Sequence, residues 1–119
     1  MDSRITKTHG LFGHVCRVEV NIHATRERVW MFLTHMEGMP TRATVTESVP
    51  NDHLTWTSGT APVFRDVRDF RLRPRADGTT DLTIEERISG LLAPPLEGTD
   101  HAPMFARYAE DVKRAAEQV

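Results

Sequence analysis

The chain has 119 residues, a length that suits one domain with one modest hydrophobic core. Hydrophobic residues make up 39% and charged residues 27% of it, as in folded globular proteins, and a net charge of −2 argues against binding to nucleic acid. No stretch reaches the roughly 20 apolar residues of a membrane span, and the first residues lack the apolar core of a signal peptide. Cys16 is the one cysteine, which excludes an intramolecular disulfide and favours a cytoplasmic protein.

We expect a single domain over residues 1–119, with residues 1–14 as an N-terminal extension. Polar and apolar residues alternate from Val15 to Ile22, which predicts a half-buried strand. Thr25 is a suitable N-cap for the helix that follows, whose apolar residues recur at helical spacing until Pro40 ends it.

Four more strands and a long helix are expected in the rest of the chain. The strands are Ala43–Val49, His53–Thr57, Phe64–Leu72 and Thr80–Ile88. The helix begins at about Pro103, which is tolerated in a first turn, with Thr99 or Asp100 as its cap. This order predicts an α+β fold in which hairpins connect antiparallel strands.

Several stretches resemble the helix-grip superfamily of START, birch-pollen-allergen-like and polyketide cyclase proteins, often called SRPBCC. They are Ile22–Trp30 (IHATRERVW), Asp52–Trp56 (DHLTW), Phe70–Thr80 (FRLRPRADGTT), Thr83–Glu86 (TIEE) with Ser89–Leu92 (SGLL), and Phe105–Lys113 (FARYAEDVK). The resemblance covers most of the chain from about Val15 and implies an antiparallel sheet of about five strands wrapped around the C-terminal helix. These stretches are structural, and none is a catalytic signature.

One departure from the family pattern concerns the segment after the first helix. The family has a β-hairpin before the strand that resembles Ala43–Val49, whereas here Met39–Thr41 leads straight into that strand. Part of the family's ligand cavity would then lack a wall, and the strand would be an uncovered edge. Since proteins rarely leave such an edge bare, we expect a homodimer through Ala43–Val49; the alternative is that residues 5–13 or the first helix cover it.

The strand Phe64–Leu72 would place charges on the same side as its apolar residues. Phe64, Asp66, Arg68, Phe70 and Leu72 share one face of a strand. The inward residues of Thr80–Ile88 are also even-numbered, so the turn between the strands must hold an odd number of residues, and Ala76–Gly78 satisfies this. The register then places Leu72 opposite Leu82, Phe70 opposite Ile84, Arg68 opposite Glu86 and Asp66 opposite Ile88.

Two interpretations of these inward charges remain open. One is a structural ion-pair network that fixes the register, to which a β-bulge near Val67 that turns the charges outward also belongs. The other is the polar end of a ligand pocket with apolar walls. Mutual pairing explains Arg68 and Glu86 better, whereas Asp66 is the better pocket residue.

The candidate ligand-binding residues combine these charges with nearby aromatic side chains: Asp66, Arg68, Glu86, Tyr108, Trp56, Phe70 and Phe105. Core packing is the simpler role for the aromatic rings, and a buried Tyr108 hydroxyl needs a partner. The six histidines show no metal-ligand spacing, so we expect no metal site, and no motif indicates a cofactor or a nucleophile.

The resemblance implies a protein that binds a small hydrophobic molecule, such as a lipid, a polyketide or another aromatic. One alternative is an enzyme of the polyketide cyclase, aromatase or dehydratase kind, with Asp66, Glu86 and Tyr108 as acid or base and Arg68 as oxyanion partner. Another is a dimeric interaction module that has lost its pocket.

Overall fold

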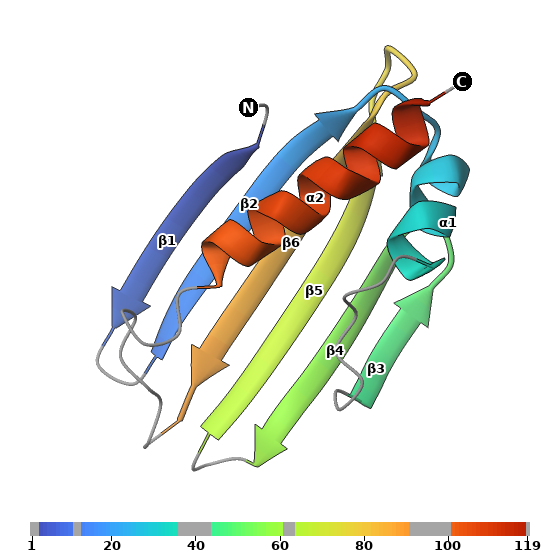
Figure 1. Cartoon of the computed structure of the whole chain (residues 1–119). Coiled ribbons are helices and arrows are strands. Elements are labelled where there is room, and N and C mark those ends of the chain that lie inside the picture. The colour runs from blue at the N-terminus through green and yellow to red at the C-terminus, as the bar shows by residue number, and fades with distance from the viewer. Residues whose placement is uncertain (1–2, 11–12, 36–43, 61–63, 91–100, 119) are drawn as a thin grey trace.

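The structure, a computed structural model, describes residues 3–10, 13–35, 44–60, 64–90 and 101–118. Its elements are β1 Arg4–Gly10, β2 Gly13–Ile22, α1 Arg26–His35, β3 Thr44–Val49, β4 His53–Thr60, β5 Phe64–Pro74, β6 Thr80–Ser89 and α2 Ala102–Glu117. The strands form one antiparallel sheet in the order β1-β2-β6-β5-β4-β3, and α2 runs diagonally across one face of it (Figure 1).

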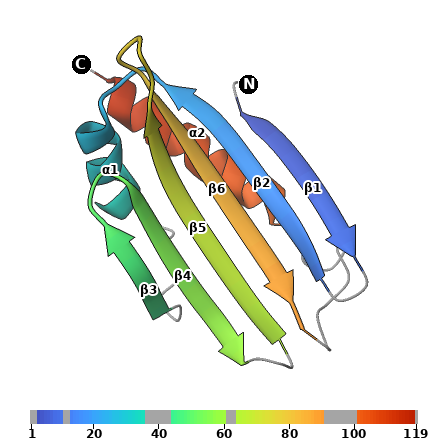
Figure 2. The ribbon, with the colours of Figure 1, turned by 180° about the vertical axis from the view of Figure 1, so that it is seen from behind.

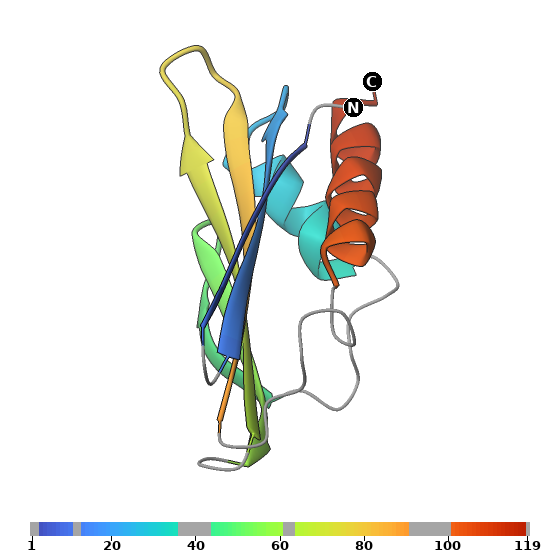
Figure 3. The ribbon, with the colours of Figure 1, turned by 90° about the vertical axis from the view of Figure 1, so that its left-hand side faces the viewer.

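The molecule has two layers, with the sheet on one side and both helices on the other (Figure 3). Seen from behind, the outer face of the sheet carries neither helix (Figure 2). This is the α+β arrangement expected from the sequence, a sheet gripping a long C-terminal helix. No helix among the described residues is long and apolar enough to cross a membrane.

β1 was not expected, because its residues were assigned to the N-terminal extension. It pairs with β2 from Arg4 opposite Glu19 to Gly10 opposite Gly13, so the described sheet has six strands rather than about five. Its sequence, RITKTHG, has one large apolar residue, Ile5, and therefore lacks the alternation that marks a strand. β1 lies at the opposite edge of the sheet from β3, so it does not cover β3.

The register of the β5–β6 hairpin is as predicted. Asp66 pairs with Ile88, Arg68 with Glu86, Phe70 with Ile84 and Leu72 with Leu82. The loop closes through hydrogen bonds from the Arg75 amide to the Thr79 carbonyl and from the Gly78 amide to the Arg75 carbonyl. Gly78 has φ +86°, the left-handed conformation that a three-residue loop needs at this position.

No β-bulge turns the charges outward near Val67. The pairing of β5 with both β4 and β6 is continuous through that residue, so Asp66 and Arg68 stay on the inner face. The register shift in the described sheet lies instead in β3, between Val45 and Glu47.

Both helices begin as local chemistry requires. The Thr25 hydroxyl accepts a hydrogen bond of 3.3 Å from the Arg28 amide, which confirms Thr25 as the N-cap of α1. α2 has His101 in the cap position and Pro103 in its first turn. The expected caps Thr99 and Asp100, and the segment with the expected helix end at Pro40, lie outside the described residues.

The hydrophobic core lies between the inner face of the sheet and α2. Alternate residues of β2 and β6 are buried there, and α2 contributes a stripe that is rich in alanine. Small side chains let the helix approach the sheet closely. Each large side chain that is fully buried, such as Ile84, contributes about 1.5–3 kcal/mol.

Tyr108 ties the two helices together. Its hydroxyl donates a hydrogen bond of 2.5 Å to the backbone carbonyl of Leu33 in α1, and its ring packs edge-on against Phe70 at 6.1 Å between centroids. Burial raises the pKa of Tyr108 to about 12, so the phenol remains a donor. This contact supplies the partner that the sequence required.

Replacing Tyr108 by phenylalanine should lower the free energy of unfolding by about 1–2 kcal/mol, because it leaves the Leu33 carbonyl without its donor. Urea unfolding monitored by circular dichroism measures this loss. Met104→Leu, at an exposed position of the same helix, should change stability by less than about 0.5 kcal/mol. Equal stability of Tyr108→Phe and the wild type would refute this role.

Candidate functional site

Four polar side chains meet where the N-terminus of α2 faces the sheet. Asp66 and Arg68 come from β5, Glu86 from β6, and His101 from the cap position of α2. We call these four residues the charged cluster. The strand alternation directs the first three inward, and His101 reaches them from the start of α2 through its contact with Glu86.

Arg68 links the two carboxylates. Its Nε donates to Oε2 of Glu86 at 3.0 Å, and its Nη2 donates to Oδ2 of Asp66 at 3.3 Å. On the other side of Glu86, Nδ1 of His101 lies 2.7 Å from Oε1. The side chains of Glu86 and Asp66 are 1% and 7% exposed, so these contacts replace the water that both carboxylates have lost.

Phe105 contacts Arg68 and His101 of the cluster from the helix side. The Arg68 guanidinium carbon lies 5.5 Å from the centre of the Phe105 ring, and the His101 ring meets that ring edge-on at 6.2 Å. A cation above an aromatic face is stabilised by the ring quadrupole. Phe105 thus has a specific electrostatic contact in addition to its burial in the core.

Glu86 has an unusual protonation equilibrium. Burial raises the pKa of its carboxyl, and the neighbouring Asp66 raises it further. His101 opposes both effects, and the pKa of Glu86 is about 7. The ordinary value is 4.5. Near neutral pH the cluster therefore holds a proton that it can release.

Two buried polar atoms near the cluster are left without a hydrogen bond among the described residues. They are Oδ1 of Asp66 and Nε1 of Trp56. Trp56 pairs with Arg68 across β4 and β5, so both atoms belong to the same region of the inner face. Native proteins pair nearly all buried polar groups, so these two atoms are exceptions within the described core.

An aromatic wall adjoins the cluster. The rings of Trp56 and Phe70 lie 5.7 Å apart, and Tyr108 follows beyond Phe70. Trp56 and Phe70 are 4% and 3% exposed, so the wall is also part of the core. The inner face thus changes along its length from apolar rings to charged groups.

The structure brings the predicted charges Asp66, Arg68 and Glu86 together, with Phe105 over Arg68 and Trp56 opposite it in the sheet, while Phe70 and Tyr108 follow beyond Trp56. Tyr108 has its hydroxyl occupied by Leu33, which separates it from the charges. Sequence reasoning missed His101, because its role depends on the direction in which α2 crosses the sheet. The usable signal was a histidine just before the final helix, whose N-terminus had to face the charged end of the hairpin.

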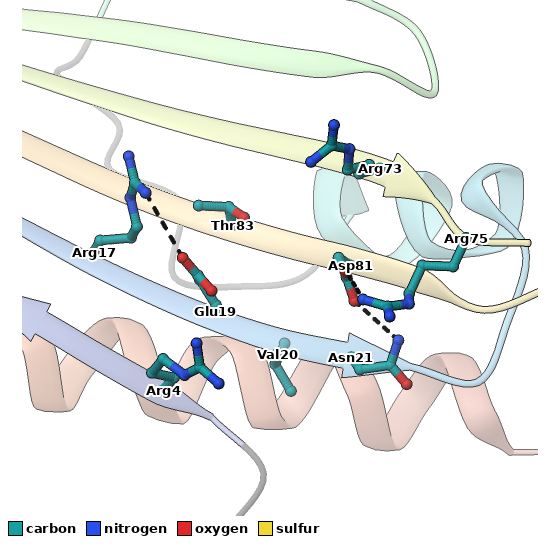
Figure 4. Close-up of a pocket in the computed structure, with 9 residues that line it drawn as sticks. All are labelled: Arg4, Arg17, Glu19, Val20, Asn21, Arg73, Arg75, Asp81 and Thr83. Carbon is teal, nitrogen blue, oxygen red and sulfur yellow. Dashed lines mark hydrogen bonds and ion pairs between the residues drawn. The ribbon is translucent and has the colours of Figure 1, made fainter.

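A hollow of about 430 Å³ lies on the outer face of the sheet (Figure 4). Its lining is mostly polar, and much of the charge is paired within the face. Arg75 bonds Asp81 at 2.8 Å, Asn21 bonds the same carboxylate at 2.9 Å, and Arg17 lies 3.7 Å from Glu19. These exposed pairs are each worth little, and they form a solvated surface away from the charged cluster.

Comparison with known proteins gives a fold but no close relative. No model of a protein family matches the sequence, and no curated protein matches it at a significant level. Solved structures do match. CalU16 from Micromonospora echinospora has a TM-score of 0.73 at 10% identity, over 98% of this chain and 87% of that one.

Two further structures support the same conclusion. EF2215 from Enterococcus faecalis, a conserved protein of unknown function, matches with a TM-score of 0.70 at 15% identity, over 97% of this chain and 78% of its own. The lipid transfer and protein localization domain of human StarD13 (DLC2) matches with a TM-score of 0.59 at 9% identity, over 100% and 86%. The chain therefore has the helix-grip fold of SRPBCC and START-like proteins. At these identities the likeness shows the fold alone.

The raised pKa of Glu86 has a consequence for stability. The folded state binds the Glu86 proton more tightly than the unfolded state does. The resulting stabilisation is complete below about pH 4.5 and is lost as the pH rises through about 7. In Glu86→Gln this contribution is absent, so the free energy of unfolding should fall less across this window, as measured by urea unfolding with a chelator present.

Glu85→Gln is the matched control, since Glu85 is the next residue and faces outward. Partial burial acts to raise the pKa of Glu85, but Arg17 and Arg87 outweigh it and lower the value. Its contribution is therefore complete above about pH 4.5 and is lost only at lower pH, so this variant should keep the wild-type slope between pH 4.5 and 7 and differ from the wild type only below that window. Identical pH slopes for wild type and Glu86→Gln would show that Glu86 titrates normally.

Proposed function

We propose that this domain binds a small, largely apolar molecule that carries a polar group. The apolar part would lie against Trp56, Phe70 and Phe105, and the polar group would face Arg68 and the neighbouring carboxylates. The observation that carries this proposal is the junction of the aromatic wall with buried charges, at which Nε1 of Trp56 is an unused donor. Apolar walls with a few convergent polar groups are typical of small-molecule sites.

The fold supports the proposal without naming the ligand. One structural neighbour, the StarD13 domain, is described as a lipid transfer domain, so a lipid is one class to test. Aromatic or polyketide molecules are other classes to test, since flat rings stack well on aromatic side chains such as Trp56 and Phe70. The buried thiol of Cys16 suits a reducing compartment, and we propose the cytoplasm as the site of action.

Native mass spectrometry of freshly purified protein tests the proposal. We expect added mass in the small-molecule range that organic solvent releases, and we expect Trp56→Ala to lose most of it because the aromatic surface and the donor disappear together. Met31→Ala, at an exposed position of α1, is the control and should retain the added mass.

A bare polypeptide mass in the wild type, together with no saturable binding of 1-anilinonaphthalene-8-sulfonate, would contradict a ligand-binding role. Retained mass in Trp56→Ala that equals the wild type would show that the molecule binds elsewhere. Circular dichroism of the variant checks that it has folded.

A second candidate is acid–base catalysis of the cyclase, aromatase or dehydratase kind. The specific observation in its favour is the contact of 2.7 Å between His101 and Glu86, beside Asp66 and Arg68. The Glu86 carboxyl can take up and return a proton near neutral pH. The Arg68 guanidinium can stabilise a developing oxyanion. Under this hypothesis Glu86→Gln would retain the bound molecule but no longer convert it.

A third candidate is self-association through β3. Its outer edge has no partner among the described strands, and Val45 and Val49 are 51% and 42% exposed. Exposed apolar residues on a free edge favour pairing with a second copy. Native mass spectrometry also reports the oligomeric state. A wild-type dimer that becomes a monomer in Val45→Lys would support self-association through β3, whereas a wild-type monomer at micromolar concentration would contradict it.

A further inference from the structure

Three potential metal ligands from three different elements converge in the charged cluster. Asp66 of β5, Glu86 of β6 and His101 at the start of α2 each direct one donor atom to a common region, and these atoms lie within 4.8 Å of one another. Bound Zn²⁺ has ligands at about 2.0–2.2 Å, so side-chain rotations of modest size would bring the three onto one ion.

The hydrogen bonds of Arg68 leave the right atoms available. Arg68 occupies Oε2 of Glu86 and Oδ2 of Asp66. Arg68 is not bonded to Oδ1 of Asp66 or Oε1 of Glu86; Oε1 instead contacts Nδ1 of His101 at 2.7 Å, a contact that an ion between the two residues would replace. An arginine that holds the far oxygens of two ligating carboxylates is the kind of outer partner that orients ligands in metal sites.

The state of Asp66 is the independent sign that a ligand belongs here. Its side chain is 7% exposed, and Oδ1 has no hydrogen-bond partner among the described residues. A buried carboxylate oxygen without a donor destabilises the folded state, and a cation bound there would remove that penalty. When both carboxylates are ionised, their charge exceeds that of Arg68 by one, which also favours a cation.

We propose that Asp66, Glu86 and His101 bind a first-row divalent transition metal ion, with Zn²⁺ as the best fit. A nitrogen and two oxygens suit zinc, cobalt or manganese, whereas magnesium and calcium prefer sites made only of oxygen. Three protein ligands would leave one position on the ion for water or another ligand. The proposal stands on the cluster's own geometry and holds whether or not an apolar molecule binds.

The sequence did not predict this site, since the three ligands are separated by 20 and 15 positions along the chain and share no local motif. The proton held by Glu86 occupies the same region and competes with the ion. The contact between Glu86 and His101 is thus the metal-free arrangement of the site.

Isothermal titration of the chelator-treated full chain with ZnCl₂ tests the proposal. We expect one Zn²⁺ per chain, competition by Co²⁺ with a visible absorption band, and no competition by equal Mg²⁺. Asp66→Asn, Glu86→Gln and His101→Asn should each weaken binding by at least about tenfold, the loss seen even for outer partners of metal sites. Asparagine is a good N-cap residue, so His101→Asn should keep α2 intact.

His53→Gln is the matched control. His53 also lies between two carboxylates, Asp52 and Glu47, but it contacts them through opposite ring nitrogens, so they cannot converge on one ion with it. This variant should bind Zn²⁺ as the wild type does. Failure of the wild type to bind Zn²⁺, equal binding by the three cluster variants, or loss of binding in His53→Gln would each overturn the proposal. Thermal unfolding of every variant confirms that it is folded.

Discussion

The pairing of Arg68 with two buried carboxylates is the constraint on which the inner face depends. Glu86 and Asp66 have almost no contact with water, and a buried carboxylate without a counter-charge would cost several kcal/mol. The observed register places Arg68 directly opposite Glu86, with Asp66 beside it on the same face of β5. A shift of β5 by one residue would move Arg68 and Asp66 together to the outer face and leave Glu86 in the core without its arginine. The charges therefore specify the hairpin as strictly as its apolar residues do.

The same constraint fixes where α2 lies. At its N-terminal end, His101 contacts Glu86 and Phe105 lies over Arg68. In its middle, Tyr108 bonds the backbone of α1. At its C-terminal end, Arg28 of α1 donates to the carbonyl of Ala116 at 2.6 Å. These polar contacts fix the position of α2 along the sheet, which its alanine-rich stripe alone would not determine. They also leave the inner face with a charged end and an apolar end.

Much of the fold followed from the sequence, because its signals are local. Alternation identified β2, β5 and β6, and the parity of their inward residues predicted the Arg68–Glu86 pair before any coordinates. β1 was not predicted, because pairing with β2, rather than its own apolar residues, keeps it in the sheet. The role of His101 was not predicted, because its position relative to Glu86 depends on the direction in which α2 crosses the sheet. No short segment of sequence determines that direction. The polar end of the site was therefore predictable from the two strands, and its helical side was not.

The structure places the Glu86 carboxyl in a buried region beside Asp66, where it keeps its proton up to about neutral pH. Carbon-13 NMR of the side-chain carboxyls, recorded on chelator-treated protein between pH 3 and pH 9, tests it directly. We expect the Glu86 carboxyl to titrate at about 7. Its inflection should disappear in Glu86→Gln and should shift to lower pH in Asp66→Asn. Titration of Glu86 at its ordinary value of 4.5 would contradict the account, because it would show that neither burial nor Asp66 acts on this carboxyl.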